Sequence, residues 1–298
     1  MSRQLCVIIS ALTFTVSLIT SCGGNPPPLS RTPNPAPNAT PVRVAAIPLN
    51  PPPNIAGESA IVVDIDSGRV LYAKNADVHR PVASTQKIVT ALCVMDDGNI
   101  DKNVTITSSD EACEPTKLYV KPGDVYTRRD LLKVLMVKSA NDIARALARD
   151  VGGSQEDFAK LMNAKAASLG MRNSYFVNPN GLPEPTQYST ARDLAIAARA
   201  AYRSPLLRSF FATKAYTFRY ADGRTRYIEN TNKVLKTVAY CNGMKTGTTN
   251  AAGRCLVATG TLNGRSVVTV VLKSNTPNIW SDSKKLLAWA LERPASES

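Results

Sequence analysis

The side chains best suited to chemistry in this chain are a serine and a lysine three residues apart, Ser84 and Lys87. They stand where a turn gives way to an apolar run, residues 88–95, so we predict that both lie on one face of the first turn of a helix. A neutral amine at Lys87 can take the proton of the Ser84 hydroxyl, and partial burial or a neighbouring positive charge would keep that amine neutral. The positive end of the helix would lie under the serine, where acyl transfer develops an oxyanion. The pair therefore predicts a nucleophile beside its base.

Two polar motifs further along the chain reinforce this prediction. Ser139-Ala140-Asn141 follows the run 131–138, and Lys245-Thr246-Gly247 precedes a segment with strand character. A Ser-x-x-Lys spacing alone is common by chance, and its ordinary interpretation is an N-capped helix with a surface lysine. The ordered trio of motifs, in contrast, resembles the signature of penicillin-binding proteins and class A β-lactamases.

The beginning of the chain does not have the composition of a folded domain. Residues 1–21 contain an apolar stretch, 5–19, that is too short and too soon interrupted for a transmembrane span, so we predict a lipoprotein-type signal peptide. Its end resembles the lipobox of bacterial lipoproteins, which makes Cys22 the predicted lipidation site; ordinary secretion is the alternative. Residues 22–54 are rich in Pro, Asn, Ala and Thr, and we expect an extended tether that spaces the domain from a membrane.

Residues 55–298 are predicted to form one catalytic domain. Strands are expected at 60–65, 69–73, 104–106, 215–220, 225–229, 254–261 and 266–272. Helices are expected from Ser84 to about residue 97, from Thr127 through Lys138, and at 141–150, 154–169, 190–202 and 281–291. Strands at both ends with helices between them predict an α+β fold of the β-lactamase/transpeptidase type. In it the first and last strands meet in one antiparallel sheet, which packs against helices beside a helical lobe.

The composition argues against several other functions. The net charge is +13, which would suit a nucleic-acid binder, but an exported lipoprotein meets little nucleic acid, so anionic wall polymer or peptide carboxylates are the expected partners. A Ser-His-Asp triad would need His79, the only histidine, yet this residue stands in a predicted loop five residues before Ser84. No Cys-x-x-Cys spacing is present, and we predict neither a metal site nor a cofactor.

Four cysteines belong to the predicted domain: Cys93, Cys113, Cys241 and Cys255. They allow three pairings, among which the sequence does not choose. Cys241 and Cys255 flank the Lys245 motif and are expected on neighbouring strands. For Cys93, on the buried face of the Ser84 helix, a free thiol acting as a small core residue is at least as good an interpretation as a disulfide.

Residues 57–292 resemble, nearly end to end, the serine D-alanyl-D-alanine carboxypeptidases among the low-molecular-mass penicillin-binding proteins. Beyond the three motifs, the resemblance rests on Arg80-Pro81-Val82-Ala83-Ser84, Phe176-Val177-Asn178-Pro179-Asn180-Gly181-Leu182, Thr190-Ala191-Arg192-Asp193-Leu194-Ala195, Asn230-Thr231-Asn232 and Gly243-Met244-Lys245-Thr246-Gly247-Thr248-Thr249. The resemblance implies an acyl-serine mechanism on peptidoglycan stem peptides that end in D-Ala-D-Ala, with β-lactams as covalent inhibitors.

By motif position, the resemblance implies catalytic roles for three residues. Ser84 would be the acylated nucleophile, Lys87 its proton acceptor, and Ser139 would relay a proton to the leaving D-alanine amine. Asn141 would hold the scissile amide or orient Lys87.

The resemblance also implies a set of substrate-binding residues. Lys245 and Thr246 would attract the substrate carboxylate, and the charge of Lys245 would help to keep the base neutral. Backbone N–H groups of Ser84 and Thr248 would form the oxyanion hole. Gly247 would let the substrate backbone approach the strand edge.

Some positions depart from the family pattern. Asn180 stands where the family usually has histidine, and Lys273 or Ser274 falls where many carboxypeptidases have an arginine that helps to bind the terminal carboxylate. The chain also ends about six residues after the last predicted helix, without the second all-β domain expected from some relatives. The lack of an arginine after the last strand weakens the case for strict carboxypeptidase action relative to endopeptidase cleavage of cross-links. A non-catalytic wall-binding lipoprotein is the rival from another class.

Overall fold

A five-stranded antiparallel sheet forms the centre of the computed structural model, which describes residues 51–113 and 115–292. In spatial order its strands are β2 (Val70–Lys74), β1 (Ser59–Asp64), β9 (Arg265–Ser274), β8 (Gly253–Leu262) and β7 (Cys241–Thr249). The first strand of the domain pairs with the last along its whole length, with Ile61 opposite Val270, as predicted. β7 lies at one edge of the sheet.

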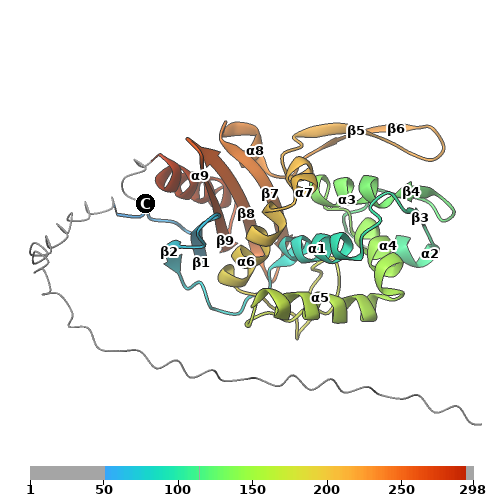
Figure 1. Cartoon of the computed structure of the whole chain (residues 1–298), viewed down its shortest axis with the longest axis horizontal. Helices are drawn as coiled ribbons and strands as arrows, with labels where there is room; N and C mark the ends of the chain where they lie inside the picture. The colour runs from blue at the N-terminus through green and yellow to red at the C-terminus, as the bar shows by residue number, and fades with distance from the viewer. Residues whose placement is uncertain (1–50, 114, 293–298) are drawn as a thin grey trace, which may run out of the picture. The chain divides into compact units, whose positions relative to one another are not determined.

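Helices cover both faces of this sheet (Figure 1). Along β1 the side chains alternate between two hydrophobic clusters, with Ile61 and Val63 in one and Ala60 and Val62 in the other, because successive residues of a strand point to opposite faces. The first cluster includes residues of α1 (Lys87–Asp97) and α6 (Ala191–Tyr202), and the second includes α8 (Lys233–Thr237) and α9 (Asn278–Leu291).

The middle of the chain forms the predicted helical lobe beside the sheet (Figure 1). Its elements are β3 (Asn103–Thr105), α2 (Ser108–Glu111), β4 (Val125–Thr127), α3 (Arg128–Val137), α4 (Asn141–Gly152) and α5 (Gln155–Leu169). The predicted N-caps Thr127, Ser154 and Thr190 each accept a backbone N–H from the residue three positions on. Over the described ranges, no helix combines the length and apolar character needed to span a bilayer.

The structure also contains elements that the sequence pattern did not predict. The short helix α7 (Pro205–Phe211), which follows α6, was not predicted, whereas the hairpin of β5 (Ala215–Arg219) and β6 (Thr225–Glu229) beyond it confirms the strands expected at 215–220 and 225–229. Neither α7 nor the shorter α2 and α8 is long enough to show a helical apolar period, although Ser204 before Pro205 is an N-cap signal for α7. The Lys245 motif lies inside β7 rather than before a strand. The predicted signal peptide and Cys22 lie outside the described residues.

Candidate active site

The predicted nucleophile and base are in direct contact. Ser84 lies on the 3₁₀ turn η1 (Ala83–Gln86), and Lys87 is the first residue of α1, so the two side chains share the helix entrance as predicted. Lys87 Nζ lies 2.8 Å from Ser84 Oγ. Ala83, just before the serine, has φ of +49°, a conformation that costs free energy in a residue with a Cβ and is found preferentially at functional sites.

Lys87 is surrounded by neutral oxygen atoms. Its Nζ donates to Asn141 Oδ1 at 2.7 Å and to the backbone oxygen of Asn180 at 2.8 Å. A neutral amine has two N–H donors and one lone pair, so these two acceptors use both donors, and the lone pair is left for the hydroxyl of Ser84. The coordination of Lys87 therefore suits the unprotonated amine that a general base requires.

Burial favours the same protonation state. Lys87 has no exposed surface, and no carboxylate within the described ranges forms an ion pair with it. Loss of solvation lowers the pKa of Lys87 well below its ordinary value, and the nearby cation of Lys245 lowers it further, while Cys113 and Asp142 act weakly in the opposite direction. The two causes that the sequence analysis proposed thus operate together, with burial the larger.

The loop that carries Asn180 completes the base site through its backbone. The Asn180 carbonyl oxygen also lies 3.2 Å from Ser84 Oγ, farther than Lys87 Nζ does, whereas the Asn180 side chain accepts within its own loop from the N–H of Leu182. A Cβ added to Gly181, which has φ of +81°, would lie 2.2 Å from the backbone oxygen of Ala83. Sequence reasoning missed this carbonyl because main-chain groups leave no residue-type signal.

The second and third motifs meet across the cleft. Lys245 Nζ on β7 donates to Ser139 Oγ at 2.8 Å and to the backbone oxygen of Thr246 at 2.9 Å. Lys245 is 1% exposed, and this burial lowers its pKa to about 7. Ser139 has φ of +64°, a second strained backbone position at the site.

The edge strand β7 approaches the nucleophile closely at its glycine. A Cβ on Gly247 would lie 2.9 Å from the backbone nitrogen of Ser84 and 2.9 Å from the backbone oxygen of Val82. Glycine is therefore required here because the strand lies against the backbone of the Ser84 turn. The approach of a substrate to this strand edge stays a prediction. Thr248, the next residue, accepts through Oγ1 from Arg254 Nη1 at 3.0 Å.

Arg254 is a functional candidate that the sequence analysis did not identify. It lines a cavity of about 360 Å³ together with Ser84, Ser139, Thr246 and Thr248. The strand register could have found it, because Arg254 stands opposite Thr248 across the hairpin of β7 and β8. Lys273, which was considered for the missing arginine, instead donates to the backbone oxygen of Ala251 at the surface.

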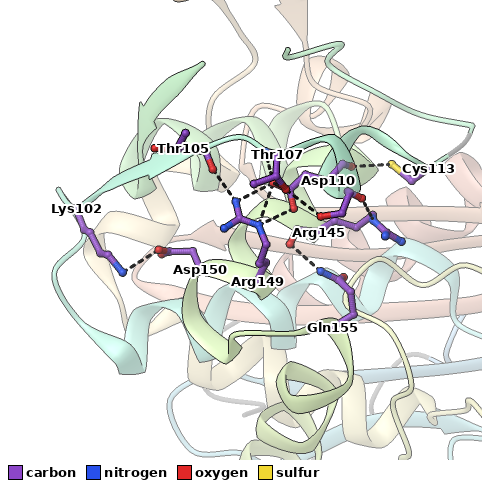
Figure 2. Close-up of polar contacts among 10 residues, drawn as sticks. Lys102, Thr105, Thr107, Asp110, Cys113, Arg145, Arg149, Asp150 and Gln155 are labelled. Atoms are coloured by element: carbon purple, nitrogen blue, oxygen red, sulfur yellow. Dashed lines mark hydrogen bonds and ion pairs between the residues drawn. The ribbon is translucent and has the colours of Figure 1, made fainter. Parts of the chain in front are cut away.

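A buried ion pair fixes the lobe segment that borders the cavity (Figure 2). Arg149 of α4 contacts the carboxylate of Asp110, which is 1% exposed, at 2.8 Å, and also donates to the backbone oxygen of Thr105 at 2.6 Å. Further along the same segment, the backbone oxygen of Thr116 accepts from the N–H of Asn141 at 2.7 Å. Helix α4 thus positions both Asn141 and the cavity wall opposite β7.

The remaining candidates lie away from this chemistry. His79 stacks on Tyr188 with 4.2 Å between ring centroids and bonds to Asn173, so neither contact involves the nucleophile. Cys93, Cys241 and Cys255 are free thiols, so none of these three cysteines forms a disulfide with another of them. Cys241 and Cys255 lie on neighbouring strands as expected, but they pack into clusters on opposite faces of the sheet. No group of three or more metal-ligating side chains occurs within 51–113 and 115–292.

A serine in contact with a buried amine, facing a cationic edge strand, defines the class of active-site-serine acyl-transfer enzymes. The family model for D-alanyl-D-alanine carboxypeptidase, peptidase S11, matches residues 46–276, and the chain belongs to this family. The predicted family, α+β fold and serine-peptidase class are therefore confirmed.

Known members are about a third identical to this chain over the residues that align. The D-alanyl-D-alanine carboxypeptidase DacF of Bacillus subtilis is 34% identical over 225 residues, which cover 74% of this chain but only 58% of that protein. The D-alanyl-D-alanine endopeptidase of Pseudomonas aeruginosa is 35% identical over 294 residues, which cover 96% of this chain and 88% of that protein. The crystal structure of a D-alanyl-D-alanine carboxypeptidase from Mycobacterium tuberculosis superimposes with a TM-score of 0.78 at 32% identity, covering 85% of this chain and 96% of the other.

Proposed function

We propose that this protein is a serine-type carboxypeptidase that removes the terminal D-alanine from peptidoglycan stem pentapeptides through an acyl-serine intermediate. The observation that carries the proposal is the fully buried amine of Lys87, 2.8 Å from Ser84 Oγ and surrounded by neutral oxygen atoms. The family membership supports the substrate class.

Acylation follows from these contacts. Lys87 takes the proton of Ser84 as Oγ attacks the carbonyl of the penultimate D-alanine. The backbone N–H groups of Ser84 and Thr248 stabilise the developing oxyanion, which is supported by the close approach of β7 to the serine turn. The hydrogen bond between Lys245 and Ser139 supports a path by which a proton reaches the leaving amine.

The substrate carboxylate is bound by the cationic wall of the cavity. Lys245 regains its proton when a carboxylate lies beside it, because an opposite charge raises the pKa of a buried amine. Thr246 and Arg254 line the same wall and supply further donors. Arg254 thus takes the place of the arginine that the sequence lacks after its last strand.

Water then hydrolyses the acyl-serine ester. The sequence has no glutamate in a Glu-x-x-Leu-Asn pattern of the class A β-lactamase type between the second and third motifs, so deacylation of a bound β-lactam is expected to be slow. Labelled penicillin is therefore expected to form a long-lived adduct on Ser84. Turnover of penicillin at hundreds per second would contradict the assignment.

The proposal is tested by D-alanine release from a stem pentapeptide. Wild type is expected to release D-alanine and Ser84→Ala is not, with unfolding curves as the check that the variant is folded. If both bind peptidoglycan and neither releases D-alanine or cleaves cross-linked dimers, a non-catalytic wall-binding function is favoured instead.

Cross-link cleavage is the second candidate function. It is favoured by the near-complete match to the P. aeruginosa protein, a D-alanyl-D-alanine endopeptidase. Dimeric cross-linked muropeptides in the same assay separate the two activities, since an endopeptidase converts them to monomers.

We also propose that the protein acts outside the cytoplasm, held at a membrane by lipid on Cys22 and spaced from it by residues 22–54. The lipobox-like end of the apolar leader and the proline-rich composition of the following segment support this arrangement. Labelled palmitate is expected to be incorporated by wild type and not by Cys22→Ser.

A further inference from the structure

A cationic groove leads away from the proposed reaction cavity. A second hollow, of about 470 Å³, shares Lys138, Thr231 and Lys233 with that cavity, so the two are adjacent. Its other walls come from β6 and α8, including Arg226 and the 67% exposed ring of Tyr227. These other walls belong to elements that the catalytic residues do not occupy.

The charges of the groove are not balanced by the protein. Its only carboxylate, Glu229, is paired with Lys236 at 2.8 Å. Lys138, Arg226 and Lys233 form no ion pair within the described parts of the chain. Arg226 donates to the backbone oxygen of Leu118 at 3.4 Å and lies over the ring of Tyr119, and Lys233 lies over the ring of Trp280, so their partners in the protein are uncharged. Three positive charges around one hollow attract an anionic ligand.

The groove begins on the leaving-group side of the nucleophile. Lys138 directly precedes Ser139, which we assign to the delivery of a proton to the leaving amine. The wall is held to β7 by a 2.6 Å hydrogen bond between Thr231 Oγ1 and Thr246 Oγ1. A departing group larger than one amino acid would therefore extend into this groove.

We propose that the groove binds the carboxylates of the second stem peptide in a cross-linked peptidoglycan dimer. Free D-alanine is small enough to leave from the first cavity, whereas a cross-linked leaving group is a whole peptide with several carboxylates. In acylation the bond between the D-alanyl carbonyl carbon and the side-chain nitrogen of the second stem breaks, the Ser84 ester forms, and that nitrogen takes up the proton. This proposal rests on the proposed acyl-serine reaction and deepens its second candidate function, cross-link cleavage.

The test compares Arg226→Gln/Lys236→Gln, two groove residues that do not line the reaction cavity, with wild type on a cross-linked dimer and on a monomeric pentapeptide. The double variant is expected to raise KM for the dimer about 5- to 30-fold, since one charge-assisted contact is lost and the carboxylate of Glu229 is left unpaired in the groove, with kcat little changed. D-alanine release from the pentapeptide and acylation by penicillin should stay within about 2-fold, because neither involves a leaving stem. Lys160→Gln/Arg172→Gln removes the same charge from the exposed surface of the lobe and should leave both KM values unchanged.

Amidation of the carboxylates on the leaving stem provides the matching substrate change. It should raise KM for wild type and have little further effect on the double variant. Equal KM changes for dimer and pentapeptide, equal effects of both double variants, or no cleavage of dimers by a wild type that trims pentapeptides would overturn the groove assignment. Failure of wild type to act on pentapeptide, dimer and penicillin alike would instead refute the proposed function.

Discussion

Two regions of this protein treat buried positive charge in opposite ways. In the helical lobe, Arg128 is 1% exposed and contacts the carboxylates of Asp97 and Asp150. In the cleft, Lys87 and Lys245 are equally buried, yet their partners are hydroxyl, amide and carbonyl oxygens. Arginine stays charged and needs counter-ions, whereas a lysine can release its proton.

The difference separates structural from chemical use of a cation. Carboxylates beside Lys87 would hold its proton and disable it as a base. Lys87 can therefore act as a base because it has no ion-pair partner. Its burial lowers the stability of the fold, as is common at functional sites. Four variants test this contrast.

The largest effect is expected from Lys87→Met. Without the base, acylation of Ser84 by labelled penicillin should slow by about 10²- to 10⁴-fold. The free energy of unfolding should change by less than about 2 kcal/mol. The substitution removes the hydrogen bonds of the amine, but it also removes the cost of burying that amine away from water. Stopped-flow acylation and urea unfolding measure the two quantities. A variant that acylates normally would show that another group is the base.

Arg128→Met is expected to do the reverse. Removing Arg128 leaves Asp150, which is 9% exposed, with Lys102 as its remaining ion-pair partner and one carboxylate oxygen without its buried donor, and this should cost about 1–3 kcal/mol of unfolding free energy. Acylation per folded molecule should be unchanged. The neighbouring Arg129→Met is the control, because its pair with Asp101 is exposed and should contribute only about 0–1 kcal/mol. Equal losses in the two variants would refute the distinction.

Stability should depend on pH through Lys245. Its pKa is about 7 in the folded protein and near the ordinary value of 10.5 when unfolded, so folding must release a proton between these limits. The penalty is complete below pH 7 and vanishes above 10.5, so wild type should gain stability relative to Lys245→Met by up to about 1.4 kcal/mol per pH unit in this window. Urea unfolding at pH 7, 8 and 9 measures the gap, and a constant gap would contradict the assignment.

The smallest effect concerns the influence of one lysine on the other. Burial is the main cause of the low pKa of Lys87 and the Lys245 cation is second, so Lys245→Met should raise the Lys87 pKa but leave it below its ordinary value. The ¹³Cε shift of Lys87 in labelled protein reports this titration. A return of the Lys87 pKa to its ordinary value would make the neighbouring charge, and not burial, the principal cause.

The sequence predicted the parts of this molecule that side-chain type determines. Ser84, Lys87, Ser139, Asn141 and Lys245 were predicted from three ordered motifs and their resemblance to a known signature. In the structure Lys87 contacts Ser84 and Asn141, and Lys245 contacts Ser139. The closure of the sheet was predictable too, since strands at both ends of a domain tend to meet when helices fill the middle.

What the sequence could not predict depends on backbone geometry or on non-local register. The carbonyl of Asn180 has no residue-type signal, and Arg254 becomes visible only when β7 and β8 are placed side by side. Helices such as α8, with five residues, are set by tertiary packing rather than by a repeating apolar pattern.

The use of a main-chain oxygen at residue 180 changes which position of that loop can vary. Any side chain compatible with the same backbone path leaves the oxygen that contacts Lys87 in place. The following glycine has no such latitude, because even a methyl group would collide with the serine turn. A sequence motif that requires histidine at position 180 would therefore exclude this chain, whereas a motif that requires the glycine at position 181 would include it.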